Sequence, residues 1–562
     1  MGPEGDSMKR VLLIGTAGLA MLAACTATVA PPTAPPPPPA PPPPPPAPFM
    51  SEMVTVTGSR VRSSAYRNDA IAGVANFTMP DQLVVDRERY EDVDPNPVMS
   101  TADEPVSTFS IDVDTASYSL VRNSLEAGRL PPTDAVRIEE MVNYFDYDYA
   151  LPPGPDEPFA THVTVTPTPW NADTQLMHIG IQGYEIIPDE RPRANLVFLI
   201  DVSGSMNSPD KLPLAVQAMH LLVDELHPDD TVALVVYASA SGVVLPPTEA
   251  RNAREIHRAL DSLSAGGSTA GGAGLALAYD LAEQNFDEDA VNRVMLLTDG
   301  DFNVGVTQDE RLEDFVARKR DSGIYLSVMG FGRGNYNDQM MQTIAQAGNG
   351  TAAYIDSRQE ARRMLVEESF SSLFTIANDV KIQVEFNPAR VAEYRLIGYE
   401  TRLLDRADFN NDEVDAGEIG SGHSVTAIYE IAAPGSEGVL MEPLRYGGAT
   451  TVEPDLDGEY GFLRLRYKRP GEDESRLIER AVTDADTVDD VGEASQEARF
   501  SIAVAGFAQR LRGDAYLAEG YDWAAIRESA AGAIGEDEFG YRAEFLDLVD
   551  RAQAADEARD KP

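Results

Sequence analysis

The sequence predicts an α/β protein built on a doubly wound, mostly parallel sheet, flanked by a β-sandwich and followed by C-terminal helices. Asn195–Met206, NLVFLIDVSGSM, begins with an unbroken apolar run, which is typical of a parallel strand buried on both faces. A second run, Val291–Asp301, and the alternating helix and strand patterns around it indicate parallel strands joined by helices. On either side of this region the hydrophobic period changes to two, which predicts antiparallel strands.

The first residues have the pattern of a secretory leader. Val11–Ala24 is apolar, follows two basic residues and is too short to span a bilayer, and Met8 is the expected start of translation. The run ends in LAAC, which resembles the lipobox of bacterial lipoproteins and implies that Cys25 is lipidated and becomes the mature N-terminus. Residues 1–25 are therefore interpreted as a lipoprotein signal peptide, in preference to a signal-like helix with an ordinary buried cysteine.

The predicted leader also indicates where in the cell the protein is located. Cys25 is the single cysteine of the chain, so intrachain disulfides and thiol catalysis elsewhere are excluded. Thr26 follows it, and by the enterobacterial sorting rule a residue other than aspartate implies the outer membrane. We expect a lipid-anchored protein of the bacterial cell envelope, on the periplasmic or surface face of the outer membrane.

Residues 26–106 are predicted to be a linker. Ala27–Pro48 is almost wholly Pro and Ala, so it should form a stiff polyproline II spacer about 60 Å long. Glu52–Arg60, EMVTVTGSR, is similar to a segment near the N-terminus of many TonB-dependent receptors. It is either a strand that adds to a partner's sheet or a solvated part of the linker, and we favour the linker.

Residues 107–190 are predicted to form an N-terminal flanking domain. Its first residues alternate like a strand, and helical spacing follows at Ala116–Ala127 and Val136–Phe145, separated by a Pro-Pro turn. His162–Ile187 then alternates twice, which predicts an antiparallel pair of strands just before the central strand.

Residues 191–377 are predicted to be the α/β domain. After the central strand, the pattern predicts strands at Thr231–Tyr237, Gly242–Leu245, Tyr325–Phe331 and Thr351–Ile355. It predicts helices at Leu212–Leu226, Ala253–Leu263, Gly272–Gln284, Gln308–Arg320, Asp338–Gln346 and Ser357–Ala377.

Residues 378–562 are predicted to be β-rich and then helical. Their strands are expected to pair with those before the α/β domain, which would then be inserted into a β-sandwich, because the two ends of a domain often lie close together. Amphipathic helices are expected at Ala494–Leu511, Trp523–Ala533 and Tyr541–Ala558.

Five residues with oxygen-bearing side chains lie at the ends of predicted strands or in the loops that follow them. Asp201, Ser203 and Ser205 follow the central strand, Thr269 lies in a glycine-rich turn, and Asp299 ends the second apolar strand. The carboxyl ends of parallel strands meet at one edge of a sheet, where such folds bind ligands. Carboxylates and hydroxyls without His or Cys suit Mg²⁺, Mn²⁺ or Ca²⁺. The alternative is that they cap helices without a metal.

In these five residues the chain resembles the von Willebrand factor type A domain and its metal-ion-dependent adhesion site. Two further blocks, Ser107–Tyr149 and Asp408–Ile431, resemble bacterial lipoproteins of the YfbK type. The resemblance implies that Ser203, Ser205 and Thr269 hold the ion, Mg²⁺ first and Mn²⁺ or Ca²⁺ as alternatives. It implies that Asp201 and Asp299 act largely through water and that an open vertex takes an Asp or Glu of a protein partner.

A second acidic loop, Asp408–Glu418, lies further along the chain. The calcium-loop pattern is not met, because Glu413 stands where glycine belongs and Ile419 where glutamate belongs. We favour a solvated turn over a second cation site.

The composition and motifs favour a binding protein over an enzyme. The net charge of −47 and the pI of about 4.3 argue against nucleic acid and anionic lipid surfaces, which leaves membrane attachment to the lipid anchor. No GxSxG, HExxH or Walker pattern is present, and His220 and His227 are expected to be surface or interface residues. The predicted function is metal-dependent adhesion. A metal-independent assembly scaffold is the alternative, and a metal-dependent hydrolase is the least favoured.

Overall fold

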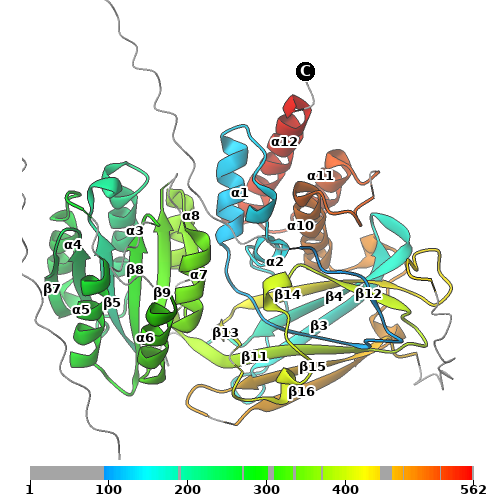
Figure 1. Ribbon diagram of the computed structural model, residues 1–562, viewed down its shortest axis with the longest axis horizontal. Helices are drawn as coiled ribbons and strands as arrows, with labels where there is room; N and C mark the ends of the chain where they lie inside the picture. Colours follow the sequence, from blue (N-terminus) through cyan, green and yellow to red (C-terminus); the bar gives the residue numbers. More distant parts are fainter. Residues whose placement is uncertain are drawn as a thin grey trace, which may run out of the picture. The chain divides into compact units, whose positions relative to one another are not determined.

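The computed structural model (Figure 1) describes residues 94–187, 191–268, 271–300, 309–332, 337–368, 371, 373–414, 416–442, 458–472, 474–518 and 520–559. The predicted signal peptide with Cys25 and the proline-rich spacer lie outside this part of the chain, as does Thr269. Within the described residues, no helix combines the length and the hydrophobicity that crossing a membrane requires.

The α/β domain is built on a six-stranded sheet in the order β10-β9-β8-β5-β6-β7. Its strands are β5 (Arg193–Asp201), β6 (Thr231–Tyr237), β7 (Ser241–Glu249), β8 (Ala290–Thr298), β9 (Ile324–Phe331) and β10 (Ala352–Ile355). β5 pairs in parallel with both β6 and β8, so Leu199 lies between Val235 and Leu296. β7 runs antiparallel to β6 at one edge. This confirms the predicted central strand and the mostly parallel sheet.

Helices cover both faces of this sheet, each over its own apolar core. One face carries α3 (Leu212–Glu225), α4 (Ala253–Asp261) and α8 (Arg358–Arg362). The other face carries α5 (Gly271–Gln284), α6 (Asp309–Asp321) and α7 (Asp338–Ala347). A strand buried on both sides has no polar face, which explains why the β5 and β8 sequences do not alternate.

The flanking β-sandwich is made of strands from before and after the α/β domain. One sheet has the order β1-β12-β14-β4-β3, and in the other β13-β11-β15-β16 is joined by β2, which pairs with β11. The strands are β1 (Met99–Ser100), β2 (Val106–Ser110), β3 (Phe159–Thr168), β4 (Asn171–Gly183), β11 (Thr375–Phe386), β12 (Glu393–Ile397), β13 (Gly417–Gly420), β14 (Ser424–Ala432), β15 (Gly461–Lys468) and β16 (Arg476–Val482).

Two pairings confirm that the α/β domain is inserted into this sandwich. β4 pairs with β14, so that Ile179 faces Ala427, and β2 pairs with β11, so that Phe109 faces Ile382. All four strands are antiparallel to their partners, and the two sheets enclose one apolar core.

A second layer of helices covers one of these sheets. α1 (Ala116–Glu126), α2 (Ile138–Val142), α10 (Gln496–Arg512), α11 (Trp523–Ala531) and α12 (Tyr541–Arg559) share a core with residues of β4, β12 and β14. The three C-terminal helices were therefore predicted correctly.

Two local predictions are wrong. The predicted helix Ser357–Ala377 stops early: α8 passes into a π-helical turn, Arg363–Glu367, and β11 begins at Thr375 because its backbone pairs with β13. The end of the predicted linker is also structured. β1 and the first residue of β2 belong to the sandwich, and Asn96 donates hydrogen bonds from Nδ2 to the carbonyl oxygens of Leu396 and Gly398.

Candidate metal site

The loop after β5 brings three of the predicted ligands together. Asp201 is the last residue of β5, and its Oδ1 accepts a 2.7 Å hydrogen bond from the backbone N–H of Ser203. The Oγ atoms of Ser203 and Ser205 lie 2.9 Å apart. A carboxylate and two hydroxyls therefore lie at the end of one strand. The hydrogen bond from the Ser203 N–H to the Asp201 side chain closes the turn that holds them.

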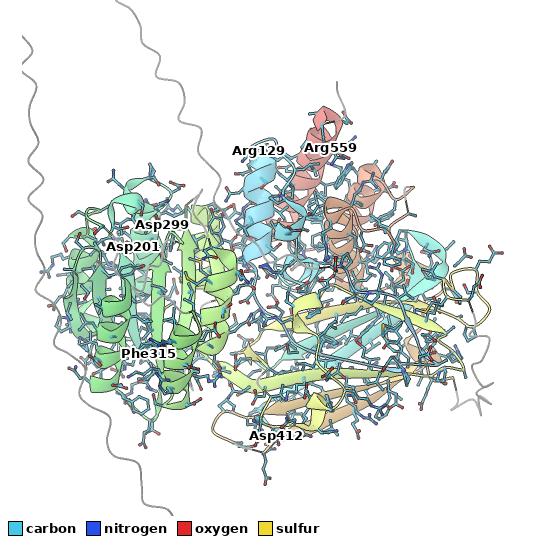
Figure 2. The ribbon with its side chains drawn as sticks, viewed as in Figure 1. Arg129, Asp201, Asp299, Phe315, Asp412 and Arg559 are labelled. Carbon is cyan, nitrogen blue, oxygen red and sulfur yellow. The ribbon has the colours of Figure 1, made fainter. Side chains whose placement is uncertain are left out.

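Asp299 reaches the same edge from the neighbouring strand. It follows β8, which is parallel to β5, and Figure 2 shows Asp201 and Asp299 at the same end of the sheet. Both carboxylates are completely buried. Asp201 and Asp299 are almost a hundred positions apart in the sequence, and the pairing of two parallel strands brings their carboxylates to one site.

The electrostatics of Asp201 fit a bound cation. Its Oδ2 is buried and has no donor at good hydrogen-bond geometry, while the nearby hydroxyl of Tyr237 interacts with the carboxylate. Burial raises the pKa of Asp201 to about 6, and the nearby Asp299 adds to this, while the hydrogen bonds from Ser203 oppose it. A buried carboxylate oxygen without a well-placed donor, beside two hydroxyls, suits a hard divalent ion.

The turn that carries Thr269 is tied to this loop. The backbone N–H of Gly204 donates a 3.0 Å hydrogen bond to the carbonyl oxygen of Gly267, and the N–H of Gly266 donates a 2.7 Å bond to the carbonyl of Val202. Gly267 has a φ of +93°, a left-handed conformation that glycine adopts without strain. Gly266 and Gly267 are therefore next to the predicted ligands, while Thr269 itself lies outside the described residues.

Lys211 is a residue of the site that the sequence analysis missed. Its Nζ donates a 2.9 Å hydrogen bond to Oδ2 of Asp299, and the ion pair is almost fully buried. Its aliphatic chain passes over Gly332, where any Cβ would overlap it. A lysine just before a helix gives no signal of its own in the sequence, because only the fold brings it to Asp299.

Neighbouring basic and hydroxyl side chains bind the second acidic loop. The ammonium of Lys381 donates to the carbonyl oxygens of Asp408 and Asn411, at 3.2 and 2.6 Å. The carboxylate of Asp412 pairs with Arg466 at 3.0 Å and accepts from Ser475, and these contacts lower its pKa. Asp415 lies outside the described residues. The carbonyl oxygens of Asp408 and Asn411 therefore bind the ammonium of Lys381 in place of a metal ion.

No group of three or more His, Cys, Asp or Glu side chains forms a metal cage within the described part of the chain. The candidate site after β5 depends instead on hydroxyl oxygens. A cavity of about 250 Å³ lies elsewhere, lined by Arg402, Asp112 and Asp114 among others. Arg402 pairs with both aspartates, at 2.9 and 3.0 Å, so the two carboxylates share one cation of the protein itself.

Comparison with known proteins extends the resemblance to most of the chain. Residues 195–368 match the von Willebrand factor type A domain, and residues 84–178 match a family described as von Willebrand factor. Residues 371–555 match the C-terminal region of the uncharacterized protein YfbK. Over 471 residues the chain is 44% identical to uncharacterized protein YfbK of Escherichia coli (strain K12), covering 83% of this chain and 81% of that protein. The chain belongs to the YfbK family.

Other similar proteins match smaller parts of this YfbK-family chain or match it less closely. The uncharacterized protein sll0103 of Synechocystis is 30% identical over 173 residues, which is 31% of this chain and 40% of that protein. A solved von Willebrand factor type A structure from Catenulispora acidiphila is 18% identical, with a TM-score of 0.36, and covers 74% of this chain and 89% of that one. YfbK is uncharacterized, so membership of its family brings no established activity.

Proposed function

We propose that this YfbK-family protein is a lipid-anchored binding protein of the cell envelope, and that its site after β5 holds Mg²⁺ to engage an acidic side chain of a protein partner. The observation that carries the proposal is the cluster of oxygen donors at this strand end: the buried Oδ2 of Asp201, which has no donor at good hydrogen-bond geometry, lies beside the Ser203 and Ser205 hydroxyls. Mn²⁺ or Ca²⁺ would suit the same oxygen donors.

The roles follow from the chemistry of each residue. Ser203 and Ser205, with Thr269, would hold the ion, while Asp201 and Asp299 would neutralise it and orient its water. The bound ion acts as a Lewis acid with an open position for the partner's carboxylate. A chain with a net charge of −47 repels acidic groups in general, so a cation lets it bind one at a defined point. Surrounding contacts would supply the rest of the affinity.

We also infer a role without catalysis. The chain has no GxSxG, HExxH or Walker pattern, and the five residues form a set of oxygen ligands, which favours binding over catalysis. Lipidation of Cys25 would anchor the protein in the outer membrane, with the proline-rich spacer between the lipid and the folded part.

The test is isothermal titration of the intact chain with Mg²⁺, Mn²⁺ and Ca²⁺. The Asp201→Ala variant is compared with Asp229→Ala, which changes an exposed aspartate in the turn before β6. We expect one ion per chain in the wild type and in Asp229→Ala, and none in Asp201→Ala. A peptide containing aspartate should raise the affinity for the ion, and the same peptide with asparagine should not.

A capture experiment from envelope extracts distinguishes the other functions. The proposed function predicts partners that are released by EDTA and absent with Asp201→Ala. Partners retained in both conditions would support a metal-independent scaffold. Turnover of phosphoesters that is lost in Asp201→Ala would support a hydrolase.

A further inference from the structure

Two histidines from different helices meet edge to edge on the α/β domain. His220 of α3 and His257 of α4 have their Nδ1 atoms 2.6 Å apart. Their ring centroids are 4.8 Å apart and the ring planes differ by 29°. The centroid separation exceeds the Nδ1 separation by about the width of one ring, which is possible only if each Nδ1 points towards the other. Together with the small angle between the ring planes, this shows that the rings lie edge to edge and are not stacked face to face.

The opposite side of each ring is bound by an aspartate of the other helix. Nε2 of His220 lies 3.2 Å from Oδ1 of Asp261, and Nε2 of His257 lies 3.1 Å from Oδ1 of Asp224. A carboxylate accepts hydrogen bonds, so each Nε2 carries the proton of its ring, and a neutral imidazole then has a lone pair on Nδ1. Two lone pairs can face each other at this distance only with a cation between them, which is either a proton or a metal ion.

We propose that His220 and His257 form a binding site for one divalent transition-metal ion, of the Zn²⁺ or Cu²⁺ class. Imidazole nitrogens favour these ions over Mg²⁺ and Ca²⁺. The two aspartates supply the outer hydrogen bonds that fix the tautomer and orientation of metal-binding histidines. The side chains of His220 and His257 are 28% and 27% exposed, so an ion can enter from solvent.

The two rings must move to hold the ion. Zn–N bonds of about 2.0–2.1 Å place two tetrahedral nitrogens about 3.3 Å apart, so the two Nδ1 atoms must separate by about 0.7 Å, and each ring must tilt by about 35° so that both lone pairs meet at the ion. Side chains that are partly exposed on neighbouring helices can make this shift. No third His, Cys, Asp or Glu converges here among the described residues, so water completes the coordination of the ion.

This site is chemically separate from the proposed Mg²⁺ site. It uses two nitrogens on a helical face, whereas the other uses oxygens at the strand ends. α3 begins at Leu212, directly after Lys211, so one short helix links the two. The proposal does not depend on the adhesion function, and each can fail without the other.

The test is titration of the intact chain, carrying no polyhistidine tag, with Zn²⁺ in saturating Mg²⁺. All variants carry Asp201→Ala to exclude Zn²⁺ from the other site. His220→Ala and His257→Ala are compared with His227→Ala, which removes an exposed histidine just beyond the end of α3. We expect one Zn²⁺ in the parent and in His227→Ala, and at least a tenfold loss of affinity in the other two, with circular dichroism confirming that each variant is folded.

Electron paramagnetic resonance of bound Cu²⁺ provides a second measurement. We expect hyperfine splitting from two nitrogens in the parent and from one in either histidine variant, and a Zn²⁺ affinity about tenfold weaker in Asp224→Asn. Cys25 is common to every variant, so its contribution cancels. Equal Zn²⁺ affinity in the parent and in His257→Ala would overturn the proposal and leave a histidine pair that is bridged by a proton alone.

Discussion

At the scale of single residues, the charge balance of the candidate site is set by three side chains. Asp201 and Asp299 are two buried carboxylates, and the ammonium of Lys211 pairs with Asp299. Lys211 thus neutralises part of the charge that would attract a divalent ion. It also leaves the ion-loaded site more positive, which favours an acidic ligand at the open position.

We therefore expect opposite effects of Lys211→Met on the two binding steps. The affinity for Mg²⁺ should rise about tenfold, because the repulsion between two positive charges a few ångströms apart in a largely buried site amounts to at least about 1 kcal/mol. The affinity of the Mg²⁺-loaded protein for an aspartate peptide should fall. Both are measured by titration calorimetry, with Lys319→Met, which removes a lysine of α6 paired with Glu283, as the control. Equal shifts in the same direction would contradict this role.

A second residue-scale prediction concerns acid stability. His178 is buried, with Nε2 2.9 Å from the Oγ of Ser501, and burial lowers its pKa to about 4. Unfolded histidine has a pKa of about 6.5, so the stabilising effect is complete above that pH and is lost as the pH falls towards 4. Between pH 7 and pH 5 this group alone should cost about 2 kcal/mol of the free energy of unfolding.

The measurement is urea unfolding of the wild type and His178→Gln at both pH values. The variant should lose less stability between pH 7 and pH 5. Burial raises the pKa of Glu139 to about 8 and that of Glu368 to about 7. These carboxyls stabilise the fold at low pH and lose that effect as the pH rises, but both proteins contain them, so they cancel in the comparison. An equal pH dependence in the two proteins would rule out the assignment to His178.

At the scale of elements, the end of the α/β domain is fixed by charges that are buried in the protein. Arg122 of α1 pairs with Asp356 at 2.5 Å and with Glu360 of α8 at 2.8 Å. Arg363, in the π-helical turn, pairs with Glu360 at 3.1 Å and donates to the Oγ1 of Thr115 at 2.8 Å. The last helical segment of the domain is therefore bound to the flanking helices by ion pairs as well as by apolar packing.

Arg122→Met should destabilise the protein by about 3–5 kcal/mol, because it leaves the buried Asp356 without its cation and Glu360 with Arg363 alone. The double variant Arg122→Met/Glu360→Gln should lose less than the sum of the two single changes. The control is Arg251→Met, whose ion pairs with Asp229 and Glu249 are exposed and worth less than about 1 kcal/mol. Free energies of unfolding from urea titration decide this, and additive single effects would contradict the network.

At the scale of the whole molecule, α1 belongs to two cores. Its Ala116 and Leu120 lie in the core under the sheet of the α/β domain, while Tyr118, Val121 and Leu125 lie in the core of the flanking helices. Because α1 packs in both cores, unfolding of either core should destabilise the other. The inserted domain and its host are thus linked by packing in addition to the chain connections.

We predict a single cooperative unfolding transition for the described unit. Both tryptophans, Trp170 and Trp523, lie in the core of the flanking helices, so their fluorescence reports that part, while far-UV circular dichroism reports all helices. The two signals should coincide in urea. Leu120→Ala should shift both together by about 2–4 kcal/mol, because it leaves a cavity in a shared boundary. Separate transitions would show that the two parts unfold independently.

The sequence by itself determined the features that depend on local pattern. The unbroken apolar runs of β5 and β8 require strands buried on both faces, and parallel strands place Asp201 and Asp299 at one edge. The spacing of Asp201, Ser203 and Ser205 is a property of one short loop, so it could be read directly. Strands of period two before and after the α/β domain were enough to predict the insertion that β4 and β14 confirm.

Only the tertiary structure decided contacts between residues that are distant in sequence. Lys211 meets Asp299, and His220 meets His257, because separate elements pack side by side, and no periodicity records such a meeting. The helix predicted at Ser357–Ala377 failed for the same reason, since pairing with β13 and β15 outweighs the local helical pattern from Thr375 onward. Local sequence fixes which backbone conformations are favourable, whereas long-range packing decides which charged and polar groups become neighbours.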